Sequence, residues 1–205
     1  MKRVIIAILA VVAAWSVSAQ DLRYGVVGGV NFAWEKAKAE GLALSSDSYI
    51  GFQAGIKAEM DLEAYIMEGF YAEGSLLYNL KGGSYSGSHS NLGYLQLPVN
   101  FGYRVAIADN VSVIGSLGPY FALGILGKDV TKSEGAKIKA DVFGERLQRF
   151  DFGLNYKLGV EMWDQWQFYL GFEHGLLNLA KKTKDIDYSL KSKTINFYIG
   201  TAFMF

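Results

Sequence analysis

Apolar and polar residues alternate strictly along residues 148–162. Every second residue is apolar, and the positions between them are polar or glycine. A period of two places successive side chains on opposite faces of a β-strand, whereas a helix would mix the two groups around its circumference. The apolar set is Phe150, Phe152, Leu154, Tyr156, Leu158, Val160 and Met162. The pattern predicts a strand with one apolar face and one polar face.

Seven further stretches repeat this alternation, and each is close to or above the 9–11 residues that a membrane-crossing strand needs. The connections alternate in length, which is typical of outer-membrane barrels with short periplasmic turns and long external loops. The eight segments are 22–34, 48–60, 66–80, 92–106, 111–126, 148–162, 166–176 and 193–205. The long connections are 35–47, 81–91, 127–147 and 177–192, and the short ones are 61–65, 107–110 and 163–165. The sequence therefore predicts an all-β fold, an eight-stranded antiparallel up-and-down transmembrane β-barrel.

Alternation alone does not decide which face meets lipid. A soluble barrel such as a lipocalin, the alternative, would turn the apolar face inward and would need a highly charged outer side. Here the polar face has only one or two charges per strand, among glycine, asparagine, serine and tyrosine. The other face is large and aromatic, as a lipid-facing band is. We therefore expect the apolar face outside, with Tyr65, Trp163, Trp166 and Phe205 at the membrane interface near the short turns.

Two irregularities are expected within this pattern. Pro98 stands in mid-strand without a backbone N–H, so it is expected to mark a β-bulge rather than a lateral weakness of the wall. Ile138, Ala140 and Val142 continue the alternation inside a long connection. The two strands that flank this connection are therefore expected to extend as a hairpin above the membrane.

Residues 1–19 have the features of a secretory signal peptide. Lys2 and Arg3 precede an apolar run that is too short to span a bilayer, and residues 17–19 approximate a small-residue cleavage site. We expect a signal peptide at 1–19, an outer-membrane β-barrel domain at 20–205 and a location in the cell outer membrane. An N-terminal membrane anchor is the alternative.

The charge balance and the absence of cysteine exclude some functions. Removing Lys2 and Arg3 from the 20 basic residues leaves 18, against 20 acidic residues. This slight acidic excess argues against a nucleic-acid binder. The chain has no cysteine, so disulfides and thiolate metal sites are excluded.

With the apolar face outside, the charges of the polar face lie in the barrel interior, where they must pair because isolated buried charges are costly. Eight strands enclose only enough space for side chains, so we expect a solid, salt-bridged core rather than a conducting channel. The expected interior charges are Arg23, Lys57, Arg104 and Lys157, with Glu59, Glu73, Asp151, Glu161 and Glu173. If Trp163 pairs with Gln167 across a short turn, Lys157 lies opposite Glu173.

The sequence offers little catalytic chemistry. His89 lies in a glycine- and serine-rich segment and is expected to be a solvated loop residue. His174 falls on the outward face near a rim and is expected at the membrane interface. No paired-carboxylate motif and no phosphate-binding loop followed by a helix occurs. We therefore expect a protein that is not an enzyme, with no catalytic, cofactor-binding or metal-binding residues.

The long connections are rich in lysine. A solvated surface is the first interpretation, and a binding site for outer-leaflet phosphate groups is the second hypothesis. The lysines are Lys128, Lys132, Lys137 and Lys139 in one connection, and Lys181, Lys182, Lys184, Lys191 and Lys193 in and beside the last.

Five short motifs carry a resemblance to a known family. They are GVVGGVNF at 25–32, YLQLPV at 94–99, FDFGL at 150–154, GLLN at 175–178 and GTAFMF at 200–205. In order and spacing the chain resembles the porin-like or PorT-like outer-membrane β-barrel proteins of the Bacteroidota, over essentially the whole mature chain. The resemblance implies a barrel in the outer membrane, with the last motif read by the barrel-assembly machinery. It implies no single activity.

The sequence favours a non-enzymatic outer-membrane barrel with a structural or surface-interaction role and loops presented outside the cell. A narrow pore or passive small-solute transporter is the alternative, and an envelope- or secretion-associated barrel of PorT-like type is the second. The expected partners are outer-membrane lipid and lipopolysaccharide, and the barrel-assembly machinery through the C-terminal strand. We expect a monomer without cofactors, while the sequence names no protein partner.

Overall fold

The computed structural model describes residues 22–39, 42–45, 48–85, 88–133, 136–143, 147–180 and 191–205. The predicted signal peptide lies outside these residues. The described residues form ten strands. They are β1 (Leu22–Ala39), β2 (Leu42–Ser45), β3 (Tyr49–Asp61), β4 (Phe70–Tyr85), β5 (Ser88–Ala108), β6 (Val111–Ser133), β7 (Ala136–Asp141), β8 (Phe150–Met162), β9 (Trp166–Gly175) and β10 (Lys191–Met204). No helix in this part of the chain is long and apolar enough to cross a membrane.

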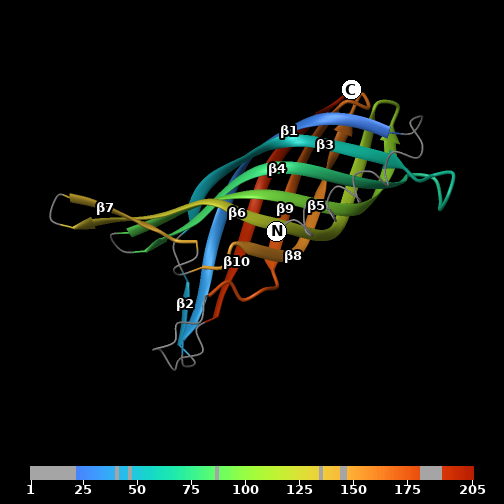
Figure 1. Ribbon diagram of the computed structural model, residues 1–205. Helices are drawn as coiled ribbons and strands as arrows, with labels where there is room; N and C mark the ends of the chain where they lie inside the picture. Colours follow the sequence, from blue (N-terminus) through green and yellow to red (C-terminus); the bar gives the residue numbers. More distant parts are fainter. Residues whose placement is uncertain are drawn as a thin grey trace.

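Eight of the ten strands form the wall of a closed antiparallel barrel (Figure 1). Neighbours in the chain are neighbours in the wall, in the order β1, β3, β4, β5, β6, β8, β9 and β10. The barrel closes where β1 pairs with β10, in a ladder that runs from Gly25–Met204 to Lys38–Lys191. The predicted fold is therefore confirmed: closure satisfies the backbone groups of the first and last strands without leaving an open edge.

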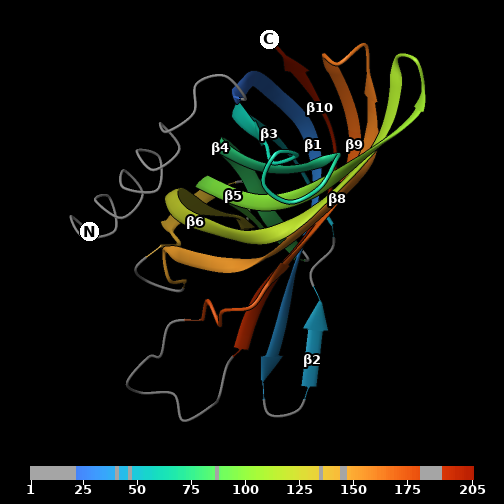
Figure 2. The ribbon, with the colours of Figure 1, turned by 90° about the vertical axis from the view of Figure 1, so that its right-hand side faces the viewer.

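The two ends of the barrel differ. The short connections 62–69, 109–110 and 163–165 lie at one end, called here the turn end, and the opposite end is the loop end. The first turn is longer than the predicted 61–65, because β4 begins only at Phe70. A backbone hydrogen bond of 2.8 Å from Leu62 N to Phe70 O closes it. Figure 2 shows strands continuing past the barrel at the loop end.

Three of the predicted long connections, 35–47, 81–91 and 127–147, are largely strand where the structure describes them, whereas most of the fourth, 177–192, lies outside the described residues. The expected loop 81–91 was wrong, because β4 and β5 remain paired from Lys81–Leu92 to Tyr85–Ser88. The expected hairpin after residue 126 is confirmed: β6 runs to Ser133 and pairs with β7. Likewise β1 continues to Ala39 and pairs with β2. The chain thus projects paired strands well beyond the barrel at the loop end.

The orientation of the two faces agrees with the prediction. Apolar side chains at alternate positions point away from the barrel, and Ile56, Leu117 and Leu158 are 60%, 61% and 64% exposed. The intervening polar side chains point inward, and Gln96 and Gln167 are fully buried. A soluble barrel with an apolar centre is therefore excluded as a description of this structure.

The turn end carries the predicted aromatic side chains. Tyr65, Trp163, Trp166 and Phe205 are all exposed there. The rings of Trp166 and Phe203 lie 4.9 Å apart, so aromatic groups from β9 and β10 adjoin one another. Such rings favour the boundary between hydrocarbon and water.

The prediction of a bulge at Pro98 was wrong. The β5–β6 ladder keeps one register on both sides of it, from Leu97–Phe121 to Phe101–Leu117, so the missing N–H interrupts the pairing without adding a residue. The ladder shifts register elsewhere. One shift lies between Ala106 and Ala108, and the other lies nearer the loop end, where Tyr94 pairs with Gly124 but Gly93 pairs with Leu126. The additional residue, Ile125, reverses the alternation of β6, and both Ile125 and Leu126 are exposed.

An arginine in the apolar band tests the lipid-facing assignment. We expect Leu158→Arg, about four residues from the strand end, to lower the free energy of unfolding in lipid vesicles by about 2–4 kcal/mol. Met162→Arg, on the same face at the turn end of β8, is the matched control and should cost only about 0–1 kcal/mol. Urea titration of the vesicle-inserted protein measures both values. Equal costs at the two depths would contradict a hydrocarbon environment around β8.

Candidate functional site

Within the barrel, the inward face carries five cations and five carboxylates, while Asp129, farther out on β6, hydrogen-bonds to the buried Ser90. The ten within the barrel are Arg23, Lys57, Lys81, Arg104 and Lys157, and Glu59, Glu73, Asp151, Glu161 and Glu173. Nine of the ten were predicted. Lys81 was missed because the third strand was expected to end at residue 80. The odd-numbered residues of this strand point inward, and Lys81 continues that alternation. The interior is therefore electrically balanced, which the predicted set of four cations and five anions was not.

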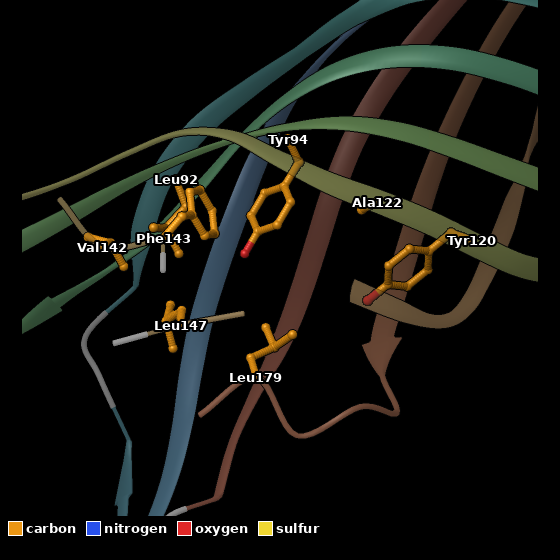
Figure 3. Packing of buried hydrophobic residues seen from close by; sticks show 8 residues of the cluster. All are labelled: Leu92, Tyr94, Tyr120, Ala122, Val142, Phe143, Leu147 and Leu179. Atoms are coloured by element: carbon orange, nitrogen blue, oxygen red, sulfur yellow. The ribbon is translucent and has the colours of Figure 1, made fainter. Parts of the chain in front are cut away.

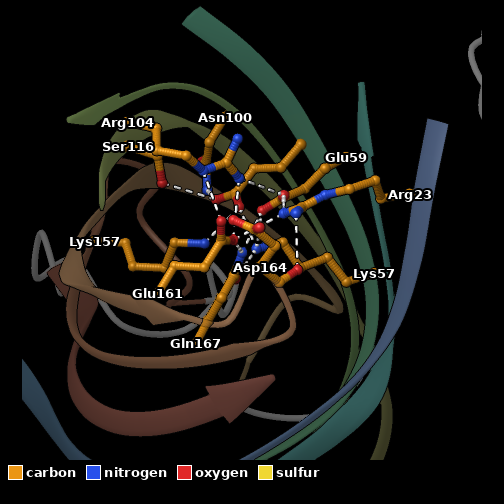
Figure 4. A network of polar contacts seen from close by, with 11 residues as sticks. Arg23, Lys57, Glu59, Asn100, Arg104, Ser116, Lys157, Glu161, Asp164 and Gln167 are labelled. Atoms are coloured by element: carbon orange, nitrogen blue, oxygen red, sulfur yellow. Dashed lines mark hydrogen bonds and ion pairs between the residues drawn. The ribbon is translucent and has the colours of Figure 1, made fainter. Parts of the chain in front are cut away.

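Two arginines and two glutamates form the cluster nearest the turn end (Figure 4). The Arg23 guanidinium lies 2.6 Å from Glu59 Oε2 and 2.7 Å from Glu161 Oε2. Arg104 approaches the same two carboxylates at 3.0 and 2.8 Å. The Gln167 amide donates to both of them, at 2.9 and 2.6 Å. These contacts tie together β1, β3, β5, β8 and β9, five of the eight wall strands.

A second cluster, in the middle of the barrel, is centred on Glu73. Lys57 Nζ lies 2.7 Å from Glu73 and 2.7 Å from Glu59, which links this cluster to the first. Lys157 also pairs with Glu73. Asn100 and Ser116 donate to the other oxygen of the same carboxylate, at 2.9 and 2.7 Å. Every oxygen of this buried glutamate therefore has a partner, as the burial of a charge requires.

The third cluster lies towards the loop end and is centred on Glu173. Lys81 Nζ lies 2.6 Å from Glu173 Oε2, which also accepts a hydrogen bond from Asn196 at 3.1 Å. Gln96 donates to the other oxygen at 2.6 Å. The ammonium group of Lys81 lies 4.9 Å from the centre of the Tyr120 ring, within the range of a cation–π contact.

Asp151 is held differently from the other interior carboxylates. Tyr120 Oη and Thr194 Oγ1 donate to its Oδ2 at 3.1 and 2.9 Å, and the Phe152 N–H donates to Oδ1 at 2.8 Å. Asp151 is therefore stabilised by hydroxyl and backbone donors, whereas each of the four glutamates pairs with an ammonium or guanidinium group.

The predicted pair between Lys157 and Glu173 was wrong. Met162, not Trp163, pairs with Trp166, so Lys157 lies opposite Gly171 and Glu173 lies opposite Asn155. The turn itself explains the shift, since Trp163 and Asp164 both have positive φ angles, 52° and 55°, and close a three-residue connection. Both charged side chains point inward as expected, but each pairs across the barrel with a residue from a distant strand.

Little space remains between these clusters. A cavity of about 20 Å³ lies beside Lys57, Glu73, Pro98 and Lys157. That volume has room for about one water molecule. The side chains of the interior thus fill the barrel where the charges meet, as the narrow interior of an eight-stranded barrel predicts.

An apolar cluster lies at the loop end (Figure 3), and two of its tyrosines, Tyr94 and Tyr120, adjoin the ammonium group of Lys81. We call it the apolar plug. It consists of Leu92, Tyr94, Tyr120, Ala122, Val142, Phe143, Leu147 and Leu179. Four of these come from connecting segments that fold into the barrel mouth, and Val142 and Leu179 are completely buried. The plug therefore closes the interior on the side of the long connections.

Backbone contacts and two glycines position the plug. Val142 N donates to Gly127 O at 3.2 Å, and Leu179 N donates to Ser192 O at 2.8 Å. A Cβ atom at Gly124 would lie 2.4 Å from the Phe143 ring, and one at Gly127 would lie 2.6 Å from it. Only glycine leaves room for this ring. Apolar residues within a lysine-rich connection were the available sequence signal for the plug, but it was not recognised.

The two histidines lie apart. His174 is on the outward face of β9, partly exposed, with Leu154 and Ile195 as its register partners, in agreement with its predicted place near a rim. His89 belongs to β5 and pairs with Ser84 and Val130, so its assignment to a loop was wrong. Among the described residues no group of three or more histidine, aspartate or glutamate side chains could hold a metal ion.

The comparisons with known proteins agree with this geometry. The family model described as outer membrane protein beta-barrel domain matches residues 5–203. The chain belongs to the outer membrane protein beta-barrel domain family. Membership indicates a location in the outer membrane and agrees with the closed barrel and its exposed apolar band. No curated protein sequence matches the chain.

Solved structures with the same kind of barrel are distant in sequence. Outer membrane protein OprG from Pseudomonas aeruginosa is 12% identical, with a TM-score of 0.50 over 89% of this chain and 95% of that chain. Neisserial surface protein A is 12% identical, with a TM-score of 0.47 over 89% and 97%. The attachment invasion locus protein Ail of Yersinia pestis is 17% identical, with a TM-score of 0.44 over 91% and 100%. At these identities the similarity concerns the fold alone.

The charge network of this outer-membrane barrel is testable by a double-mutant cycle. We expect Glu73→Gln to lower the free energy of unfolding by about 3–5 kcal/mol, because it leaves two buried lysines without their shared partner. Adding Lys157→Met should recover part of that loss, since one unpaired charge is removed with it. Equilibrium unfolding from detergent or vesicles measures the four proteins of the cycle.

The matched control cycle combines Lys157→Met with Glu173→Gln. These two residues belong to separate clusters, so their effects should add within about 0.5 kcal/mol. Two results together would contradict the observed pairing: strong coupling between Lys157 and Glu173, and additive effects of Glu73 and Lys157. They would instead support the Lys157–Glu173 pair predicted from the sequence.

Proposed function

We propose that this protein is a non-enzymatic, non-conducting barrel of the outer membrane, and that it presents a protruding β-sheet outside the cell for surface interaction. The closed interior is the observation that carries the proposal. Three clusters of paired charges fill the barrel, and the apolar plug covers them at the loop end. Among the described residues, the space beside these charges amounts to about 20 Å³, which disfavours a role as a narrow pore.

The lengths of the strands support a role outside the membrane. A membrane-crossing strand needs about 9–11 residues. The ten residues of β9 meet this need, whereas β5 has 21 residues and β6 has 23. The additional residues extend beyond the loop end, where β4, β5, β6 and β7 continue as one antiparallel sheet (Figure 1). A barrel with only a structural role in the membrane would not need this sheet.

Several parts of the proposal rest on the sequence. We infer that residues 1–19 direct export and are removed, that the C-terminal motif is recognised by the barrel-assembly machinery, and that the protein acts as a monomer in contact with lipopolysaccharide. The resemblance to porin-like or PorT-like proteins of the Bacteroidota stays a prediction. A role in secretion is not proposed, since no described residue favours it.

Conductance in planar bilayers tests the closed interior. We expect no current steps above the lipid background for the unmodified protein. The variant Phe143→Ala/Leu147→Ala, which loosens the plug, should also remain silent, because the charged clusters below it still fill the barrel. Regular single-channel steps from the unmodified protein would contradict the proposal and favour the pore.

Surface labelling tests the direction of the barrel. The chain has no cysteine, so one introduced cysteine is a unique target. Thr131→Cys in the protruding sheet should react with a membrane-impermeant maleimide on intact cells. Asp109→Cys, at the turn end, is the control and should react only after the outer membrane is permeabilised. The reverse pattern would place the sheet in the periplasm and refute its display at the surface.

A further inference from the structure

Two ladders of the wall are interrupted along the same stretch of β5. The β4–β5 ladder lacks the rungs of residues 97–98, and the β5–β6 ladder lacks the rungs of residues 99–100. The chain has two prolines, Pro98 on β5 and Pro119 on β6, and both lie here without an N–H for the ladder. As far as the structure describes them, the other wall ladders have no missing rung. Residues 97–100 are therefore where the wall is paired least.

The interior cavity lies on the inner side of this interruption. Pro98 and Asn100 line it, together with Ser75, which would be the partner of Pro98 in an unbroken β4–β5 ladder. The volume of about 20 Å³ has room for about one water molecule. The cavity can therefore take only a particle of the size of water or a monatomic ion.

Two amide oxygens at this cavity lack a hydrogen-bond partner among the described residues. They are Gln53 Oε1 and Asn100 Oδ1, and both side chains are only 3% exposed. The amide nitrogen of Asn100 donates to Glu73 Oε1 at 2.9 Å. Because an ionised carboxylate only accepts hydrogen bonds, this contact fixes which end of the Asn100 amide is the oxygen. Buried amide oxygens normally have a partner, so the cavity calls for a hydrogen-bond donor.

The cavity also offers a donor of its own. Lys157 lines it, and in the described part of the chain its ammonium group has one oxygen partner, Glu73, and faces the Tyr169 ring at 5.0 Å. An ammonium group has three hydrogens, so one remains for the cavity. Lys57 also lines the cavity, but two glutamates and a glutamine already accept its three hydrogens at 2.6–2.7 Å.

Two acceptors and one donor around so small a space match one water molecule. A water molecule donates two hydrogen bonds and can accept others, and buried waters typically make about three. A cation such as sodium would face the ammonium groups of Lys57 and Lys157, and both oxygens of the nearby Glu73 already have partners. A small anion would face the two amide oxygens. A neutral water molecule is therefore favoured over either ion.

We propose that this cavity is a specific binding site for one water molecule, which donates to Gln53 and Asn100 and accepts from Lys157. The water joins β3, β5 and β8 behind the stretch where β5 lacks ladder partners. It replaces part of the missing backbone pairing and helps to hold the wall closed at residues 97–100. Bound on three sides, it is a fixed part of the closed interior. The proposal goes beyond the proposed function and does not depend on which end of the barrel faces outward.

The test detects the water by NMR in the full barrel in detergent micelles, through magnetisation transfer from water to the side-chain amide of Asn100. We expect a cross peak of the sign that marks a bound water. Gln53→Met removes one acceptor at nearly constant volume, so the cross peak should be lost. Gln96→Met is the matched control, because this buried glutamine bonds to Asn79 and Glu173 and is not among the described residues that line the cavity. There the cross peak should remain.

Three results would overturn the proposal. The first is the absence of the cross peak from the unmodified protein. The second is a cross peak of equal intensity in Gln53→Met, which would assign it to proton exchange through a neighbouring hydroxyl or ammonium group. The third is a saturable shift of the Asn100 amide signal with sodium chloride but not with choline chloride, which would identify a sodium ion in place of water.

Unchanged heat-modifiable migration on gels verifies that both variants remain folded. If Gln53→Met does not fold, the cross peak and the salt titration of the unmodified protein still decide the question. The conductance and labelling experiments do not involve this cavity, so a failure of this proposal is distinguishable from a failure of the proposed function.

Discussion

The pairing of charges inside a narrow barrel is the constraint on which this structure depends. The outward face is apolar, so the charged side chains of the wall strands must lie inside. There they lack water and would each cost several kcal/mol without a partner. Four of the five carboxylates pair with cations, and Asp151 is held by hydroxyl and backbone donors. Each cluster joins strands that are far apart in sequence, so the same contacts that neutralise the charges also hold the wall closed.

This constraint also bears on function. Side chains that neutralise one another across an eight-stranded barrel occupy the space that a pore would need. With the plug above them, the membrane-embedded part becomes a solid support. The part beyond the barrel does not depend on these charges, because the backbone of β4 to β7 forms its own sheet there. In the proposed function, interaction with partners therefore falls to that sheet and to the outward surface, rather than to the interior.

Much of the fold could be predicted from the sequence, because alternation reports directly on which face of a strand is buried. It identified the eight wall strands and nine of the ten interior charges. It failed where the answer depended on pairing between strands. Lys157 was expected opposite Glu173, yet a turn with two residues at positive φ shifted the register, and the true partner, Glu73, comes from a strand 84 residues away. No local pattern encodes such a contact.

The loop end was predicted least well. Glycine and serine around His89 suggested a loop, but pairing with β4 and β6 on both sides keeps that segment extended. The plug required Phe143 to meet Gly124 and Gly127, a contact set by the bulge and by the return of the chain rather than by periodicity.

The most direct test of the paired interior is a solid-state NMR measurement of contacts between lysine Nζ and glutamate Cδ in lipid bilayers. The structure requires correlations for Lys157–Glu73 and Lys81–Glu173, since the corresponding ion pairs are closed. It requires no correlation for Lys157–Glu173. It also requires that the signals of the interior lysines be shielded from exchange with water. Correlations between Lys157 and Glu173, or interior lysines in rapid exchange with water, would contradict a closed, paired core.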